Sequence, residues 1–413
     1  MTGKSVIIIG GGIIGVNAAC FLSEAGYAVT VIDRDGICEG TSSGNAAAFD
    51  FSDILPLAHK GMLKNVPRWL LDPLGPLSIP PAYFPRVLPW LIRMLREGAP
   101  SKRDKSIAAQ ASMMRLSEAE TMALAGRAGI STMIRNDGSL ELYTSEASFQ
   151  SGLPGWAYRQ KHGVPFEHVR GQRLAELQPG LSPSVIAATF SPSWRTVSNP
   201  KDYTLALWGY ALTLGAKFEH GEARELRPYA GGASADLKDG RRLSADFVIN
   251  CAGAWSHRLA AAIGERIPLE TERGYNTTLP STAFDAKRML IFGEDGFVLT
   301  PLSNGIRIGG AVELAGLDRP PNYKRSVAML EKARRYLPGL NTQDGTQWMG
   351  FRPSLPDSLP AIGRSKASAH IIHGFGHGHH GLTQSAATGR LLCDLVSGQT
   401  PAIDMSPFNP HRF

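Results

Sequence analysis

The N-terminal segment has apolar runs on either side of a glycine-rich turn. Residues 6–9 (VIII) are a continuous apolar, β-branched run, as expected for a strand buried on both faces. A helix-forming stretch follows the turn and ends before Gly26, and residues 28–33 (AVTVID) form a second strand pattern. This order predicts a βαβ unit and therefore a parallel sheet in an α/β fold.

The turn itself has the GxGxxG spacing, at Gly10, Gly12 and Gly15. In a dinucleotide-binding turn the first glycine permits the tight turn, the second admits a pyrophosphate and the third lets helix and strand pack closely. The helix N-terminus offers free N–H groups to phosphates, and Asp33 is placed to accept hydrogen bonds from a ribose. An acid there disfavours NADP, but NAD, FAD and a turn without any ligand stay open.

A loop of small and polar residues follows the second strand at residues 41–49 (TSSGNAAAF). Its short polar side chains are Thr41, Ser42, Ser43 and Asn45, and its glycine and alanines allow close backbone approach. Such a loop can wrap a second phosphate and lead towards a flavin ring. The alternative is an ordinary polar surface loop.

Two later segments extend the predicted architecture. Residues 246–255 (DFVINCAGAW) predict an apolar strand that ends in a small-residue turn at 251–253, where open α/β sheets bind ligands. Residues 294–314 alternate in polarity and contain Asn304-Gly305, a dipeptide typical of β-hairpins. An antiparallel sheet this late in the chain predicts a second domain interleaved with the first.

Composition narrows the class of protein. The 413 residues suit two domains, and 43% hydrophobic with 19% charged residues is typical of a globular protein. Lys and Arg exceed Asp and Glu by 43 to 36, a net charge of +7 without runs of like charge. This surplus favours anionic small molecules or an anionic membrane face as partners, and it gives no reason to expect nucleic acid.

Cysteine usage and targeting signals indicate a cytoplasmic protein. The cysteines are scattered without a CxxC pair, which predicts reduced thiols rather than disulfides or a zinc ribbon. The N-terminus lacks the pattern of a signal peptide, and no stretch reaches the roughly 20 apolar residues of a membrane span.

Four blocks together resemble the D-amino-acid oxidase superfamily of FAD enzymes, which includes glycine oxidase, sarcosine oxidase and the small subunit of D-amino acid dehydrogenase. The blocks are residues 6–34 with 41–49, residues 245–256, residues 267–280, and residues 348–365 with 374–398. They reach from one end of the chain to the other, and the likeness is strongest to bacterial dehydrogenase-like members.

The resemblance implies a fold of class α/β, or α+β for the whole chain. It implies a Rossmann-type FAD-binding domain assembled from residues 1–50, 146–262 and 345–413. An antiparallel-sheet substrate domain made of residues 51–145 and 263–344 is expected to be inserted between those segments.

The cofactor implied by the resemblance is FAD, bound without a covalent link. Covalent sarcosine oxidases carry a cysteine near the position of Gly350, and this chain has none there. The residues expected to contact FAD are Gly10, Gly12, Ile13, Ile14, Gly15, Asp33, Arg34, Thr41, Ser42, Ser43, Asn45, Ala46, Ala223, Cys251, Ala252, Gly253, Trp255, Gly376, Gly378, His379, Gly381, Leu382 and Thr383.

Four histidines, His373, His377, His379 and His380, stand in a glycine-rich stretch near the C-terminus. A metal site is one reading, but the stretch lacks a recognisable zinc spacing and adjacent histidines tend to point apart, so we expect no metal. The preferred reading is that one or two of them face the substrate and the others pack or face solvent. His379 and His380 are the two expected at the substrate.

A helix is expected directly after this stretch, with Thr383 as N-cap and Gly398 as C-cap. In the family the glycine-rich block lies against the flavin. The helix N-terminus would therefore point at the flavin N1–C2=O edge, where reduced flavin carries negative charge.

Arg352, in the segment GFRPSLP, aligns with the family arginine that grips the substrate carboxylate. A guanidinium is always charged and binds a carboxylate through two parallel hydrogen bonds, and Pro353 limits the backbone of Arg352 to extended conformations. Tyr275 and Arg273 are weaker candidates for the same pocket. A structural arginine at position 352 is the alternative.

The function expected is oxidation of a small amino or imino acid, by hydride transfer from Cα to flavin N5 and hydrolysis of the imine to an oxo acid plus amine or ammonia. The candidate substrates are D-amino acids and N-substituted glycines such as sarcosine or an iminodicarboxylate. The histidines favour a second carboxylate. The alternatives are an NAD enzyme and a non-catalytic flavin-binding subunit of a larger complex.

The segment 80–98 is apolar and aromatic, with Arg86, Arg93 and Arg96 spaced through it. It is too short to span a bilayer, so it either lies in a membrane interface as an amphipathic segment or packs on the substrate domain. Peripheral contact with the inner face of the cell membrane is therefore one expectation. The electron acceptor, the respiratory chain or oxygen, stays open.

Overall fold

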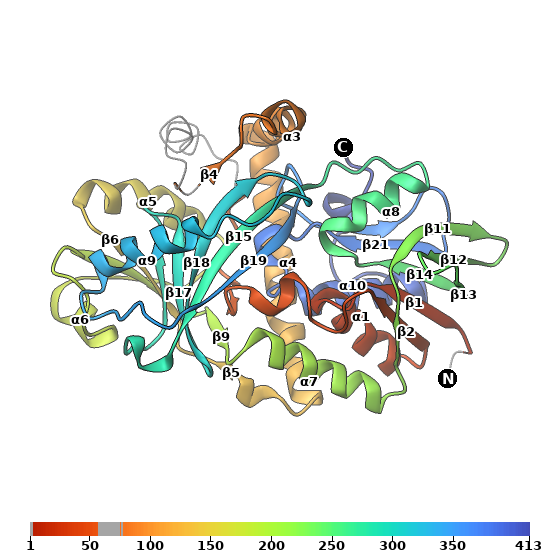
Figure 1. The fold of residues 1–413 in the computed structure, drawn as a ribbon, viewed down its shortest axis with the longest axis horizontal. Helices are drawn as coiled ribbons and strands as arrows, with labels where there is room; N and C mark the ends of the chain where they lie inside the picture. The colour runs from red at the N-terminus through yellow and green to blue at the C-terminus, as the bar shows by residue number, and fades with distance from the viewer. Residues whose placement is uncertain (1–2, 57–74, 76) are drawn as a thin grey trace.

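The computed structural model describes residues 3–56, 75 and 77–413. Two β-sheet regions lie side by side along the long axis of the molecule, and both ends of the chain lie on the side of the first region (Figure 1). This arrangement confirms the mixed α/β class expected from the sequence.

The first region contains a six-stranded sheet. Its strands follow the order β10 (Lys217–His220), β2 (Ala28–Asp33), β1 (Ser5–Ile9), β14 (Phe247–Asn250), β21 (Ile371–Phe375) and β20 (Ala361–Arg364). The first five run parallel and β20 is antiparallel to β21. The predicted βαβ unit is confirmed, because β1 and β2 pair in parallel on either side of helix α1 (Ile13–Glu24).

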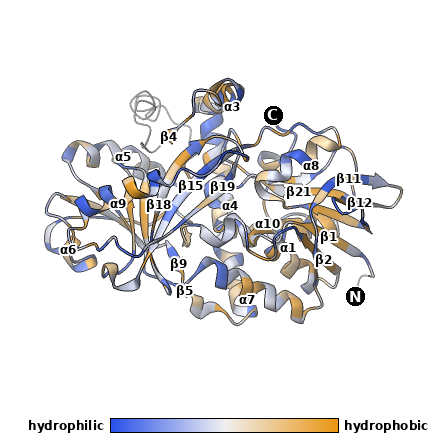
Figure 2. Ribbon diagram, viewed as in Figure 1, coloured by the Kyte–Doolittle hydropathy of each residue, from blue (hydrophilic) through white to orange (hydrophobic). Residues whose placement is uncertain are grey.

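Apolar side chains cover both faces of this sheet. One face packs against α1, α7 (Pro200–Thr213) and α10 (Ser385–Ser397). The other face packs against α8 (Ser256–Ala262) and a small sheet of β11 (Ala223–Tyr229), β12 (Gly232–Leu237) and β13 (Arg242–Ala245). Figure 2 shows the hydrophobic colour concentrated along β1, β2, α1 and α10. Burial on both faces explains the uninterrupted apolar run at 6–9.

The C-terminal helix α10 corrects one prediction. Its end is as expected, since Gly398 takes the left-handed conformation. Its start is not, because the helix begins at Ser385 after Gln384, without a side-chain cap. The hydroxyl of Thr383 instead donates to the carboxylate of Asp50 and accepts a hydrogen bond from the Asp50 N–H at 3.1 Å.

The second region is a nine-stranded sheet. Its order is β19 (Thr346–Ser354), β15 (Glu270–Leu279), β18 (Gly305–Leu314), β17 (Phe297–Leu302), β16 (Met289–Phe292), β6 (Ser139–Tyr143), β8 (Ala187–Ser191) and β7 (Glu167–Val169), with β4 (Leu77–Ser78) beside β18. The Asn304-Gly305 hairpin is confirmed, because β17 and β18 pair with Leu302 opposite Gly305. The β6–β16 and β4–β18 pairs are parallel, so the sheet is mixed rather than purely antiparallel.

The membership of this sheet differs from the expected domain segments at three strands. β7 and β8 fall in the segment 146–262, and β19 begins the segment 345–413, yet all three join the nine-stranded sheet. Their partners are distant in sequence, since β19 pairs with β15 and β8 with β6. The local sequence pattern of a strand does not predict which distant strand it will pair with. The division of the chain into two domains with the expected bounds therefore stays a proposal.

The remaining elements flank or join the two regions. α5 (Glu146–Lys161), α6 (Gly171–Leu177) and α9 (Lys324–Tyr336) pack at the nine-stranded sheet. The long helix α4 (Pro100–Arg127) packs on α10 and also contacts α5 through Tyr158. A three-stranded sheet of β3 (Ala48–Phe49), β9 (Arg195–Val197) and β5 (Ile134–Arg135) lies beside it.

The segment 80–98 forms the helix α3 (Phe84–Glu97), which projects at the edge of the molecule (Figure 1). Among the residues that the structure describes, no helix combines the length and apolar character that crossing a bilayer requires.

Candidate active site

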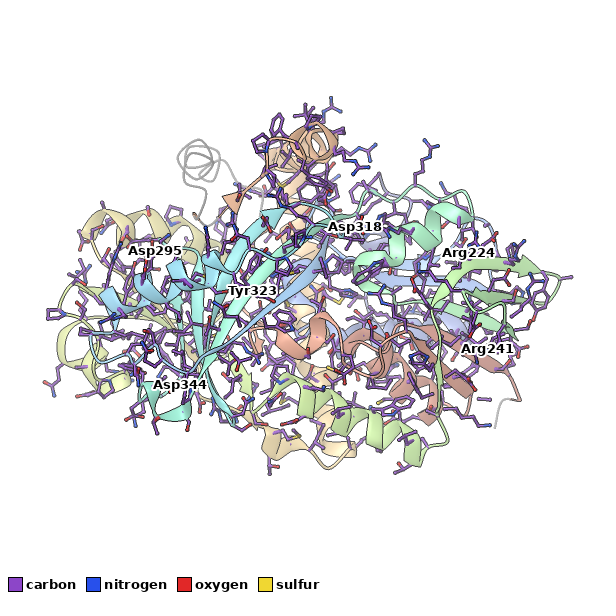
Figure 3. All side chains as sticks on the ribbon, viewed as in Figure 1. Arg224, Arg241, Asp295, Asp318, Tyr323 and Asp344 are labelled. Carbon is purple, nitrogen blue, oxygen red and sulfur yellow. The ribbon has the colours of Figure 1, made fainter. Side chains whose placement is uncertain are left out.

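A cavity of about 660 Å³ lies between the two sheet regions. The carboxyl ends of β1, β2 and β14 line one side, and β15, β18 and β19 line the other. Arg224, labelled in Figure 3 in the first region, lies near the start of β11 and lines this cavity. Open α/β sheets bind ligands at this position, outside the carboxyl ends of the strands.

Most of the residues expected at the cofactor line this cavity. They are Gly10, Gly12, Ile13, Ile14, Asp33, Arg34, Thr41, Ser42, Asn45, Ala46, Ala223, Cys251, Ala252, Gly253, Trp255, Gly378, His379, Gly381 and Leu382. Arg352 and Tyr275, expected at the substrate, line it as well.

Gly15, Ser43, Gly376 and Thr383 do not line the cavity. A Cβ at Gly15 would lie 1.9 Å from the Gly10 carbonyl oxygen, so this glycine serves helix–strand packing, as its place in the motif predicts. The Ser43 hydroxyl donates to a backbone carbonyl of its own turn at 2.9 Å. A Cβ at Gly376 would meet the side chain of a buried leucine at 2.6 Å, so close packing explains that position too.

The glycine turn and the polar loop meet at the start of α1. The Ile13 N–H donates to Ser42 Oγ at 2.9 Å, and a Cβ at Gly12 would lie 3.1 Å from the same oxygen. Gly10 has φ +113°, and a Cβ there would lie 2.3 Å from the Cys251 carbonyl oxygen. The helix N-terminus therefore faces a narrow space that only a residue without a side chain leaves open.

The opposite end of the motif is formed by a carboxylate and a cation–π pair. Asp33 accepts hydrogen bonds from the Gly11 N–H at 2.7 Å and the Asp35 N–H at 2.8 Å. The Arg34 guanidinium lies 4.0 Å from the centre of the Trp255 ring. Since Asp33, Arg34 and Trp255 all line the cavity, they form one continuous wall of it.

Side chains of the nine-stranded sheet hold the polar loop in place. They donate to the backbone carbonyls of residues 44–46: Asn276 to Gly44 at 2.7 Å, Thr300 to Ala46 at 2.9 Å and Arg307 to Asn45 at 2.7 Å. Burial lowers the pKa of Arg307 to about 10, so it stays protonated at neutral pH. Sequence reasoning missed these residues, although polar side chains inside apolar strands were the available signal.

Trp348 is a further cavity residue that sequence reasoning missed. Its ring fills the space beside Gly44 and Gly350, where a Cβ would lie 2.2 Å and 2.0 Å from ring atoms. Gly44 thus allows close approach, as expected, but the group that approaches is this indole. A cysteine side chain at position 350 would collide with the same ring.

Two of the four histidines, His373 and His377, are buried and bound to polar partners, and His377 also lines the cavity. His373 is fully buried in β21, and its Nε2 lies 2.7 Å from the Glu265 carboxylate. Burial opposes charge on Glu265, but hydrogen bonds from His373 and Ser365 hold its pKa at about 2. His377 is buried, with Nε2 2.9 Å from the Thr388 hydroxyl, and burial lowers its pKa to about 3, so it is neutral.

His379 and Arg352 both line the cavity, and Glu272 lies next to both: it is hydrogen-bonded to His379 and stands opposite Arg352 in the β15–β19 register. His379 Nε2 is 2.7 Å from Glu272 Oε2, and the ring is still one-third exposed. Burial alone would raise the pKa of Glu272, but His379 and Arg352 hold it below its usual value. Arg352 pairs with Glu272 across β15 and β19, and a Cβ at Gly274 would lie 2.4 Å from its guanidinium. The glycine therefore makes the space that Arg352 occupies.

His380 does not line the cavity, which differs from its expected place at the substrate. Its Nδ1 is 2.9 Å from Asp50 Oδ2, and although burial opposes its charge, Asp50 raises its pKa to about 9. In the described part of the chain, Asp50, Asp53 and His380 are the group close enough to share a metal ion. Asp53 is paired with Arg159 at 2.9 Å, and His380 is protonated, so these groups neutralise one another.

Tyr275 and Arg273 are both buried in β15 of the nine-stranded sheet, and their polar groups are hydrogen-bonded there. The Tyr275 hydroxyl donates to Glu313 at 2.5 Å, and burial raises its pKa. Arg273 is fully buried and donates to the Gly316 carbonyl oxygen at 2.8 Å. The expectation that Arg273 belongs to the pocket was wrong, because it does not line the cavity and its guanidinium holds the loop after β18.

A family model described as "FAD dependent oxidoreductase", the DAO family, matches residues 5–395. The chain belongs to this family. A D-amino-acid oxidase of Bradyrhizobium diazoefficiens is 34% identical over 421 residues, which covers 100% of this chain and 99% of the relative. A D-amino acid dehydrogenase of Rhizobium johnstonii is 29% identical and covers 97% of each chain.

Solved structures show the same fold. Glycine oxidase from Geobacillus kaustophilus superposes with a TM-score of 0.79 at 22% identity and covers 99% of each chain. The match extends over both sheet regions, so the whole architecture is that of the family. The chain is accordingly an FAD-dependent oxidoreductase.

The cavity residues fit FAD. The gap at Gly12 before the α1 N-terminus suits a pyrophosphate, and the Asp33 carboxylate at the end of β2 suits a ribose. The loop 41–46, held from the nine-stranded sheet, continues the same wall towards Arg352. These residues would hold the cofactor along one continuous surface.

Proposed function

We propose that this chain oxidises a small amino or imino acid by removing a hydride from its α-carbon. The imine that results is hydrolysed by water to an oxo acid and an amine or ammonia. Bound FAD would supply the hydride acceptor, N5 of its ring. The observation that carries the proposal is the position of Arg352 and His379, which line the same cavity as the expected cofactor contacts.

Arg352 is the group proposed to bind the substrate carboxylate. One guanidinium nitrogen donates to the Ala311 carbonyl oxygen at 2.9 Å, which fixes the side chain. Burial lowers its pKa and Glu272 opposes that effect, so the cation persists. A fixed guanidinium that binds both carboxylate oxygens would orient Cα as well as hold it.

His379 is the group proposed to select among substrates. Glu272 accepts a hydrogen bond from its Nε2 and therefore orients the ring at the cavity wall. An oriented imidazole beside Arg352 suits a second anionic group on the substrate. We therefore propose D-amino acids and N-substituted glycines as candidates, with dicarboxylic members preferred. The names of the two relatives, a D-amino-acid oxidase and a D-amino acid dehydrogenase, support this class.

We also propose that FAD is bound non-covalently, because Trp348 leaves no room for an attaching side chain at Gly350. Flavin should then stay in the supernatant when the protein is precipitated with acid. Flavin that remains in the pellet would contradict this and require another attachment residue.

One experiment tests the function and identifies the electron acceptor. The purified holoprotein is mixed with a panel of D-amino acids and N-substituted glycines, with and without an artificial acceptor, while flavin absorbance and peroxide are followed. Bleaching by a substrate supports the proposal, and peroxide then distinguishes an oxidase from a dehydrogenase. A protein whose flavin is inert to the whole panel would instead be the non-catalytic flavin-binding subunit of a larger complex.

A further inference from the structure

Helix α3 carries a continuous apolar stripe on its outer surface. Phe84, Leu88, Ile92 and Leu95 are each 39–44% exposed, and they are four of the large hydrophobic side chains most exposed in the described chain. At about 100° per residue these four positions fall within an arc of roughly 80° on the helix. They therefore form one surface, although they are spread over three turns of sequence.

The inner face of the same helix is anchored. Val87 and Trp90 are buried against Leu314 at the end of β18, and the Trp90 Nε1–H donates to the Pro268 carbonyl oxygen at 3.1 Å. Tyr83, just before the helix, donates to the Glu270 carboxylate at 3.1 Å. The sequence left two alternatives for this segment, packing on the protein or facing a membrane. The structure shows packing for the inner face only, so the outer stripe is additional apolar surface held in a fixed orientation.

Cations border the stripe. Arg93 and Arg96 are exposed, and at about 100° per residue Arg96 lies about 40° beyond the apolar arc and Arg93, on the flank of the helix, about 100° beyond it. Within the described residues neither has a carboxylate within ion-pair distance, whereas the single acid of the helix, Glu97, is paired with Lys102 at 2.8 Å. An apolar stripe next to unpaired arginines is complementary to the surface of an anionic membrane. The apolar side chains can contact the acyl chains, and the arginines can contact the negatively charged headgroups.

A second apolar patch on the protein shows how specific this pattern is. Leu205 and Leu212 on α7 are 39% and 48% exposed, similar to the α3 residues. The basic residue at that helix's start, Lys201, is already paired with Glu39 at 2.8 Å. The α7 patch therefore has similar apolar exposure but no unpaired basic residue at the start of its helix. It serves as a matched control for the α3 stripe.

We propose that α3 docks this enzyme on an anionic lipid surface, with Phe84, Leu88, Ile92 and Leu95 inserted between headgroups and Arg93 and Arg96 at the phosphates. A second copy of the chain is a poorer occupant, because a symmetric contact through this face would bring the same arginines together. The proposal concerns location and is independent of which substrate the cavity takes. Val312 lines the cavity and also packs in the cluster under α3, so docking would hold the cavity close to the membrane.

The test is co-sedimentation of the holoprotein with vesicles, either of phosphatidylcholine alone or of phosphatidylcholine with phosphatidylglycerol. Wild type should bind the anionic vesicles and release as salt is raised. Arg93→Gln with Arg96→Gln should weaken binding about thirtyfold, the effect of two basic residues near an anionic surface. Leu88→Asn with Ile92→Asn should remove most of the binding. The matched control, Leu205→Asn with Leu212→Asn on α7, should bind as wild type.

Thermal unfolding and flavin absorbance of each variant show that the fold is intact, so no substrate is needed. Wild type that stays in the supernatant with both vesicle types would overturn the proposal, as would α3 variants that bind like wild type. Equal loss in the α7 control would show that general surface hydrophobicity drives binding. Sedimentation velocity without lipid completes the test, because a dimer that the α3 variants abolish would assign the face to a second copy instead.

Discussion

The glycine turn at residues 10–15 and the histidine stretch at residues 373–380 are both rich in glycine, yet they relate to the cavity in different ways. The turn contacts its own strand, helix and following loop and, at Gly10, the end of β14, and Gly10 and Gly12 lie at the cavity as the spacing predicts. The histidines have four different partners, which lie in two loops, one helix and one strand. The role of each residue in a motif defined by local backbone geometry can be predicted from the sequence. The roles of residues in a polar run depend instead on the groups that the fold places next to them.

The largest effect is expected from a substitution in the glycine turn. Gly12→Val should abolish FAD binding, because its side chain would occupy the space at the α1 N-terminus, where a Cβ already lies 3.1 Å from Ser42 Oγ. Flavin per chain, measured by absorbance, checks it. Gly126→Ala is the control, since a Cβ there meets nothing within 4 Å. Full flavin occupancy in Gly12→Val would show that the pyrophosphate lies elsewhere.

Arg352→Lys should give the next largest effect, since lysine keeps the charge but loses the two parallel hydrogen bonds. We expect a rise in KM and a loss in kcat/KM worth roughly 2–5 kcal/mol, the scale for disrupting one partner of a buried charge pair. Flavin content should stay normal. Wild-type kinetics in Arg352→Ala would remove this residue from substrate binding and with it the main support for an amino-acid substrate.

His380 should matter for stability rather than for substrate choice. Its folded pKa is raised to about 9 by Asp50, so the pair's contribution is complete below pH 6.5 and is lost as pH rises through about 9. The loss amounts to at most roughly 3 kcal/mol in the free energy of unfolding. In Asp50→Asn the melting temperature should fall less steeply between pH 6.5 and 9 than in wild type or in the exposed control Asp35→Asn. Parallel curves for all three proteins would contradict the pairing.

His379→Ala should give the smallest effect and the most selective one. With flavin content near normal, we expect the preference for dicarboxylic over monocarboxylic substrates to fall about tenfold, the scale of one charge-assisted hydrogen bond. Glu272→Ala should shift the same ratio in the same direction, because it removes the acceptor that orients the ring. An unchanged ratio in both variants, or zinc bound at one per chain, would end the substrate-selection hypothesis.

Of the fold and site together, the sequence by itself determined the parts that depend on neighbours along the chain. The βαβ start, the Asn304-Gly305 hairpin and the left-handed Gly398 follow from side-chain period and from the few residues that such turns accept. The family blocks added the identity of the cofactor, because four motifs in one order are far more specific than any one of them.

Only the tertiary structure decided the rest. It placed β7, β8 and β19 in the nine-stranded sheet, paired Thr383 with Asp50 rather than with a helix end, and put His377 and His379 at the cavity but not His373 or His380. The physical reason is that a hydrogen-bonding group must find a partner once it is buried, and the available partners come from distant segments that the fold brings together. Glu272 lies 107 positions from His379, and no local pattern could have paired them.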